Sequence, residues 1–166
     1  MNKRGQAAME FLMTYGWAIV VVLAAIGALA YFGVLSPQKL LPDRTTFSAP
    51  VPNVDNAVVD RTNDLVAVAF RNNKGVAIKI PQTGTFTSTY CGGTPAITNV
   101  TDSTTGTTIA AGTNIENGAG FIITWSCTHG TAASGSKFKA DVAFDYVNSE
   151  TGQTLKQTGT IEGKWG

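Results

Sequence analysis

The residues of this chain that could do chemistry are two cysteines and one histidine. His129 follows Cys127 by two positions, and an imidazole beside a thiol is the arrangement that activates a cysteine nucleophile. Cys91 is the only other cysteine. Because the hydropathy pattern described below places both cysteines outside the cytoplasm, where disulfides persist, we predict that they pair. Pairing would consume the thiolate, so we expect no catalytic residue; two unpaired buried cysteines are the alternative.

Acidic and amide side chains gather between positions 55 and 64, and their oxygens could bind calcium. They are Asp55, Asn56, Asp60, Asn63 and Asp64. Their spacing lacks the order and the glycine of an EF-hand loop, so we expect a solvated loop and no metal. The chain also has no phosphate-binding loop, nucleophile elbow, zinc-protease helix or dinucleotide-binding motif. We therefore expect neither an enzyme nor a cofactor.

One sequon for N-linked glycosylation is present. It is Asn99-Val100-Thr101, and it lies in a stretch rich in threonine, glycine and asparagine. Such a polar stretch forms little core, so we expect it at the surface. Asn99 is therefore a candidate glycosylation site, although sequons also arise by chance.

The element that must position the first part of the chain is a long apolar segment. Phe11 to Leu35 comprises 25 consecutive uncharged residues. As a helix this segment is roughly 37 Å long, enough to cross a hydrocarbon core of about 30 Å. Lys3 and Arg4 precede it, and cations on that side favour a cytoplasmic N-terminus. We expect the bulk of the chain to be exported.

A removable signal peptide and a plain membrane anchor are the two simpler explanations of this segment. Ala28-Leu29-Ala30 has the form of a signal-peptidase site. However, Glu10 stands at the start of the apolar run, where a carboxylate is unnecessary for secretion and costly in a membrane helix unless it is paired or near the interface. The acid therefore invites a functional explanation.

The first eleven residues carry a resemblance to a known family. Two basic residues, Gly5, Gln6, small residues and Glu10 occur in the order Lys-Arg-Gly-Gln-Ala-Ala-Met-Glu-Phe, directly before the apolar segment. This order resembles the processing site of archaeal type IV pilin precursors, which have a class III signal peptide. The resemblance implies that a membrane-embedded prepilin peptidase cuts between Gly5 and Gln6. Residues 1–5 would then be a cleaved leader, and the apolar helix would stay in the mature protein.

The resemblance also implies what the retained helix does. A helix of residues 6–35 that leaves the bilayer must bury its apolar surface among copies of itself, because exposure to water would cost tens of kcal/mol at about 25 cal/mol per Å². Phe11, Tyr15 and Trp17 would supply contact area, and small residues would allow close approach. Glu10 would pair with the new amino terminus of a neighbouring subunit. If Gln6 cyclises to pyroglutamate, Glu10 needs another hydrogen-bond donor or stays protonated.

The exported body is predicted to be all-β. Residues 36–44 contain two prolines and form a short linker, and residues 45–166 form the globular head. Period-2 patterns and turn signals predict seven strands: Leu65 to Phe70, Val76 to Ile80, Thr83 to Tyr90, Thr107 to Ala110, Phe121 to Ser126, Phe138 to Val147 and Thr154 to Trp165. We predict hairpin turns at 72–75 and 148–152. The expected fold class is α+β, a long hydrophobic helix followed by an antiparallel sandwich-like domain.

Composition narrows the choice of function. The chain has 166 residues, a net charge of +1 and only 14% charged residues, so it lacks the basic field that holds nucleic acid. The expected function is a structural subunit of an archaeal type IV pilus-like filament for surface adhesion. The expected partners are copies of itself, the prepilin peptidase, an assembly ATPase and its membrane platform. The chain would reside in the cytoplasmic membrane before assembly and in an extracellular filament afterwards. The alternative is a membrane-tethered or secreted β-sandwich that binds a ligand; an archaellin is a lesser option.

Overall fold

The computed structural model describes residues 3–31 and 42–166, and the chain divides into two units, Met1–Leu41 and Pro42–Gly166. The first unit contains one helix, α1 (Lys3–Tyr31). The predicted helix of residues 6–35 is found as far as Tyr31, and residues 32–35 lie outside the described residues. The same holds for residues 36–41 of the predicted linker. Its last residue, Arg44, already belongs to the first strand of the second unit.

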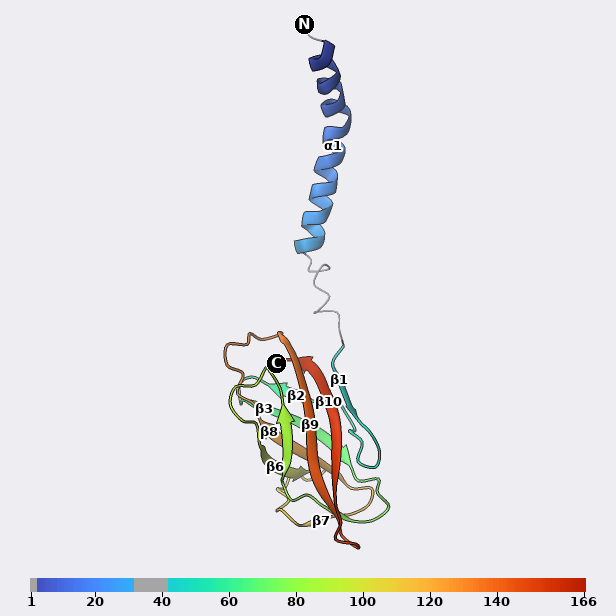
Figure 1. The fold of residues 1–166 in the computed structure, drawn as a ribbon, viewed down its shortest axis with the longest axis vertical. Coiled ribbons are helices and arrows are strands. Elements are labelled where there is room, and N and C mark those ends of the chain that lie inside the picture. The colour runs from blue at the N-terminus through green and yellow to red at the C-terminus, as the bar shows by residue number, and fades with distance from the viewer. Residues whose placement is uncertain (1–2, 32–41) are drawn as a thin grey trace. The chain divides into compact units, whose positions relative to one another are not determined.

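The second unit consists of strands arranged in two antiparallel sheets (Figure 1). One sheet has the order β1-β10-β9-β4-β7, and β5 pairs with the same edge of β9 as β4; the other has the order β2-β3-β8-β6. The strands are β1 (Arg44–Phe47), β2 (Val58–Asp60), β3 (Leu65–Arg71), β4 (Ile78–Lys79), β5 (Gly84–Thr87), β6 (Ile97–Asp102), β7 (Asn114–Ile115), β8 (Gly120–Ser126), β9 (Lys137–Asn148) and β10 (Thr154–Lys164). The predicted combination of an apolar helix with an antiparallel β domain is confirmed.

The strand β9 organises the larger sheet because one of its faces is apolar throughout. Phe138, Ala140, Val142 and Phe144 are buried, while Lys139 between them is exposed. This alternation, which the sequence predicts, places every second side chain in the core. The turn predicted at 148–152 is also present, and it joins β9 to β10 as an antiparallel hairpin.

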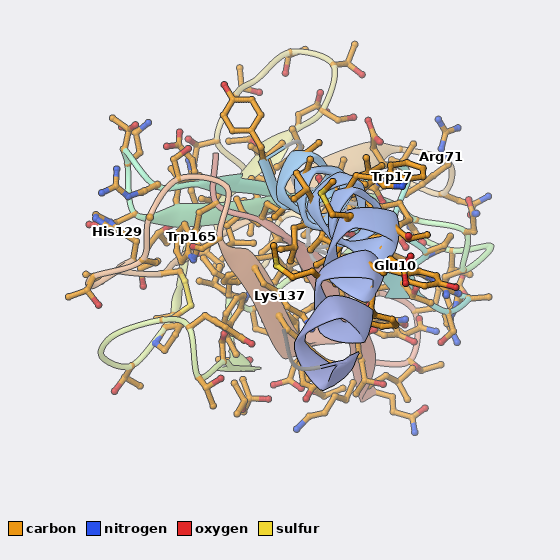
Figure 2. The ribbon with its side chains drawn as sticks, turned by 90° about the horizontal axis from the view of Figure 1, so that it is seen from above. Glu10, Trp17, Arg71, His129, Lys137 and Trp165 are labelled. Atoms are coloured by element: carbon orange, nitrogen blue, oxygen red, sulfur yellow. A yellow bond between two sulfur atoms is a disulfide. The ribbon has the colours of Figure 1, made fainter. Side chains whose placement is uncertain are left out.

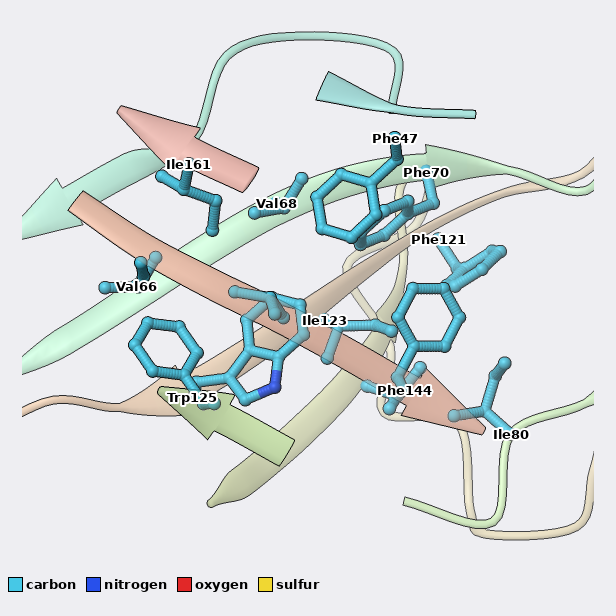
Figure 3. Close-up of a cluster of buried hydrophobic side chains, with 14 of the residues drawn as sticks. Phe47, Val66, Val68, Phe70, Ile80, Phe121, Ile123, Trp125, Phe144 and Ile161 are labelled. Atoms are coloured by element: carbon cyan, nitrogen blue, oxygen red, sulfur yellow. The ribbon is translucent and has the colours of Figure 1, made fainter. Parts of the chain in front are cut away.

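Side chains of both sheets meet in one core (Figure 3). The ring of Phe70 on β3 lies 4.9 Å from the ring of Phe144 on β9 and 4.8 Å from that of Phe47 on β1. Trp125 on β8 lies 5.9 Å from Phe86 on β5. Edge-to-face and tilted aromatic pairs of this kind stabilise beyond the area that they bury. The two sheets are therefore held together by direct aromatic contacts.

One predicted strand and one predicted hairpin are wrong. Thr107 to Ala110 is not a strand; Thr108 makes a single bridge to Thr101. The segment 72–75 does not form a hairpin either, because β3 and β4 belong to different sheets. The chain passes from one sheet to the other at Asn72. This residue is fully buried, and its side-chain amide donates to the carbonyl groups of Val76 and Ile115 at 2.9 Å each, which holds the chain in this path.

Four short strands have no counterpart among the predicted ones: β1, β2, β6 and β7. They lie at sheet edges and contain many polar residues, so alternation within them is weak. Their pairing is decided by longer neighbouring strands rather than by their own sequence.

Candidate functional site

The most prominent candidate site is the surface of α1. Every large apolar side chain that the structure describes on this helix is exposed, including Phe11 at 60%, Tyr15 at 54% and Trp17 at 67%. Its segment Met13–Tyr31 has a mean hydropathy of 2.0, none of it is buried, and it is long and apolar enough to cross a membrane. Such a surface requires lipid or apolar protein around it. By length and composition alone the helix fits a membrane anchor or a signal sequence.

The predicted assembly residues lie close together near the start of α1. Glu10 is exposed, and its backbone carbonyl accepts a hydrogen bond from the Thr14 hydroxyl at 2.8 Å. The ring of Phe11 lies 4.8 Å from that of Tyr15, one turn further along. Gly5 and Gln6, the predicted cleavage junction, are also part of α1. The helix therefore carries the junction, the carboxylate and the aromatic residues within its first four to five turns.

One side of the helix is also shaped for close contact. The small side chain of Ala18 leaves a shallow apolar hollow bordered by Tyr15, Ile19, Val22 and Leu23. Small residues of this kind let a second helix approach closely, and the larger neighbours then supply contact area. The surface can therefore accept an apolar helix as well as lipid.

A second candidate site surrounds the disulfide of the β domain. Cys91 and Cys127 are joined, as predicted, with their Cα atoms 5.0 Å apart. Cys127 is buried and has no thiolate, so the cysteine–histidine pair is not a nucleophile in this structure. The bond ties the segment after β5 to the segment after β8.

His129 is instead partnered by Asp64, which lies 65 positions earlier. The Asp64 Oδ1 atom accepts hydrogen bonds from the His129 backbone N–H at 2.8 Å and from the ring Nδ1 at 2.6 Å. These bonds lower the pKa of the Asp64 carboxyl below its ordinary value, the backbone bond contributing most. The backbone carbonyl of Asp64 also accepts from Cys127 N–H at 2.7 Å. The pair therefore fixes the segment after β8 to the turn between β2 and β3.

An aromatic ring and an open hollow lie beside His129. Figure 2 shows His129 near Trp165, and their rings are 6.1 Å apart. An open hollow of about 330 Å³ also adjoins His129, bordered by Thr89, Tyr90, Cys91, Gly92, His129, Gly130, Thr131 and Ala132. Threonine hydroxyls here have no adjacent base among the hydrogen bonds of the described chain. The arrangement is suited to holding loops together.

The acidic residues between positions 55 and 64 do not converge. Asp60 accepts bonds from the backbone N–H groups of Thr62 and Asn63 and from the Asn63 amide, and the side-chain bond contributes most to lowering its pKa. Asp55 binds the neighbouring Asn56 N–H. Within residues 3–31 and 42–166, no group of three or more His, Cys, Asp or Glu side chains could hold a metal ion.

Asn99 lies in β6, not in a loop. It is half-buried and follows a register irregularity between Ile97 and Asn99. Because β6 is the last strand of its sheet, the sequon still lies at an edge. Its glycosylation remains a prediction.

Comparison with known proteins adds no family to this description. No protein-family model matches the chain, and no curated protein is significantly similar to it.

Proposed function

We propose that the chain is the structural subunit of a type IV pilus-like filament, processed between Gly5 and Gln6 and polymerised through α1. One observation carries the proposal: the order Gly5, Gln6, Glu10 stands in the first turns of a helix, α1, whose described large apolar side chains are exposed. A prepilin peptidase, an assembly ATPase and a membrane platform would be its partners in that pathway. The mature chain would leave the membrane and stand at the cell surface, where adhesion is the expected use.

The β domain suits the outer part of such a filament. It has its own core and a disulfide, which persists outside the cytoplasm. Its two sheets with a shared aromatic core are compatible with the predicted sandwich-like architecture. A glycan on Asn99 would add a hydrophilic cover at the edge strand β6.

The mass of the mature protein separates this proposal from its alternatives. A filament subunit begins at Gln6, with or without cyclisation. A secreted ligand-binding domain would begin near Tyr31, after the Ala28-Leu29-Ala30 site, and a tethered one would retain its first residues. A mature chain that begins near Tyr31 would contradict the filament, because the polymerising helix would be gone.

Glu10→Ala tests assembly itself. We expect at least about a tenfold loss of filaments by electron microscopy. In the proposed filament the Glu10 carboxylate pairs with the amino terminus of a neighbouring subunit, and without it that buried terminus would have no charged partner. Glu116→Ala, at an exposed position of the β domain, is the matched control and should leave the filament count unchanged. Undiminished Glu10→Ala filaments would exclude the assigned role of Glu10.

A further inference from the structure

The exposed edges of the two sheets are nearly all covered by polar groups of the same chain. On β1 the Asn53 side chain accepts from Phe47 N–H and donates to the Thr45 carbonyl, at 3.0 Å each. Asn56 Oδ1 accepts from Thr45 N–H at 3.2 Å. Two asparagine side chains thus replace a neighbouring strand. Coverage of this kind prevents edge-to-edge association.

The edges of three more strands are covered or very short. Gly166 covers the Val59 carbonyl of β2, and the segment before β7 covers β6. The bonds are Gly166 N–H to Val59 C=O, Ile109 N–H to Val100 C=O, and Asp102 N–H to Thr107 C=O, at 2.7 to 3.0 Å. β7 has only two residues, and such short edges offer little to a second strand. The remaining part of β6 carries the register irregularity, which also opposes pairing.

The strand β5 differs from all of these. Asp145 N–H donates to Thr83 C=O at 3.0 Å, which makes 83 and 145 a hydrogen-bonded pair. Because such pairs alternate along an antiparallel ladder, Gly84 and Phe86 direct their N–H and C=O groups away from β9. Within the described chain these groups have no hydrogen-bond partner on the outer side of the strand.

The side chains of β5 also lack the usual protection of an edge. None of its residues is charged, and proline is absent. Thr85 is exposed on the outer face of the sheet, while Phe86 is buried in the core. Gly84 has no freedom to become a charged residue, because a Cβ at that position would collide with the carbonyl of Ala143. β5 is thus an uncharged edge without proline, of the kind that accepts another strand.

We propose that β5 pairs with β5 of a second copy of this chain. The copy is the occupant because the complementary strand must itself have a free edge, and among the described strands of four or more residues β5 is the one whose outward backbone groups all lack a partner. A two-fold axis at Thr85 places Gly84 opposite the second copy's Phe86, so both residues exchange two hydrogen bonds. The uncharged strand brings no like charges into the pair.

This pairing is a contact in addition to those that form the proposed filament, and only its consequence for bundling depends on the filament. A two-fold contact cannot propagate a filament by itself, but it joins heads that belong to two filaments lying side by side. Each pair is a small contact of four backbone hydrogen bonds. Repetition along two filaments makes the association strong through avidity, so the proposed lateral bundling rests on filament formation.

Disulfide trapping tests the register on the full chain in detergent micelles. Thr85→Cys places two cysteines across a non-hydrogen-bonded pair, whose Cα atoms are about 4.5 Å apart, within the range that a disulfide spans. After mild oxidation we expect at least about tenfold more covalent dimer than with Thr158→Cys, an exposed position on the interior strand β10. Equal trapping at both positions, no dimer, or trapping of a protein of different mass would overturn the proposal.

A second variant links the contact to bundling and separates the two proposals. Thr85→Lys places like charges opposite each other, so filaments should form but no longer associate laterally; persistent bundles would overturn the pairing. Glu10→Ala combined with Thr85→Cys should lose filaments yet still form the covalent dimer in micelles. Failure of trapping beside normal filaments would therefore contradict the β5 contact alone, and trapping without any wild-type filaments would contradict the polymer alone.

Discussion

Asp64 is the residue through which two distant segments of the β domain are held together. It has a positive φ of 54°, uncommon for a residue with a side chain, and its backbone and carboxylate both bind the segment 127–129. Hydrogen bonds compensate for this conformation. The residue adjoins the buried end of the disulfide, so loss of its contacts loosens that end of the domain.

Asp64→Asn should lower the unfolding midpoint at neutral pH, because the amide replaces a charged acceptor of two hydrogen bonds. The folded pKa of Asp64 is lowered, so the carboxylate stabilises the fold above the ordinary aspartate pKa and loses that effect as pH falls through the folded pKa. Thermal unfolding measured between pH 7 and pH 2 should therefore show that the midpoint of the wild type falls towards that of the variant in acid. Asp55→Asn, which binds only the adjacent backbone, is the control; a gap that stays constant with pH would contradict the assignment.

At the scale of elements, the sheet edges decide which strands remain available to other molecules. Asparagine side chains cover β1, while β5 on the same sheet has no such cover. The difference has a local cause. The segment after β1 returns alongside it and brings Asn53 and Asn56 to its edge, whereas β7 pairs with β4 and does not reach β5.

Asn53→Ala should destabilise the β domain by about 1–3 kcal/mol, because partly buried backbone groups of Thr45 and Phe47 lose their partners. Chemical denaturation of the full chain in detergent measures the change. Asn73→Ala removes an exposed amide for which the structure gives no side-chain bond and should be nearly neutral. Equal effects of the two variants would show that the edge cover does not contribute.

The disulfide acts on the longest polar stretch of the head. It joins positions 36 residues apart, and in the chain-entropy model a loop of this length contributes roughly 4 kcal/mol. The double variant Cys91→Ser/Cys127→Ser should lose about that much free energy of unfolding. The reduced wild type should unfold at nearly the same denaturant concentration as this double variant. A variant as stable as the oxidised wild type would show that the bond constrains nothing in the unfolded chain.

At the scale of the whole molecule, the two units have different requirements. The β domain has a contiguous core of its own, while α1 exposes its apolar side chains. A unit with its own core can fold alone, and an exposed apolar helix cannot stay dispersed in water.

Deletion of residues 1–41 should therefore give a soluble, folded β domain. We expect it to remain in the supernatant without detergent and to unfold in one transition similar to that of the head in the full chain. The full chain, treated identically, should pellet or need detergent. A truncated domain that fails to fold would contradict the independence of its core.

The features that the sequence alone determines are those that depend on neighbours along the chain. The 25 uncharged residues from Phe11 to Leu35 form an apolar segment long enough for a membrane-length helix, whatever the rest of the chain does. The structure contains this helix as far as Tyr31, the last described residue of the first unit. The alternation in β9 is equally local, and two cysteines allow one pairing. The order of Gly5, Gln6 and Glu10, on which the proposed function rests, is likewise a local pattern.

Only the tertiary structure decides the contacts between distant residues. No spacing relates Asp64 to His129, and nothing in the segment 72–75 indicates that buried Asn72 sends the chain into the other sheet. The short edge strands and the open side of β5 follow from which longer strands lie beside them. Every residue except proline has the same backbone hydrogen-bonding groups, so the partners of these groups depend on packing and leave little signal in the sequence.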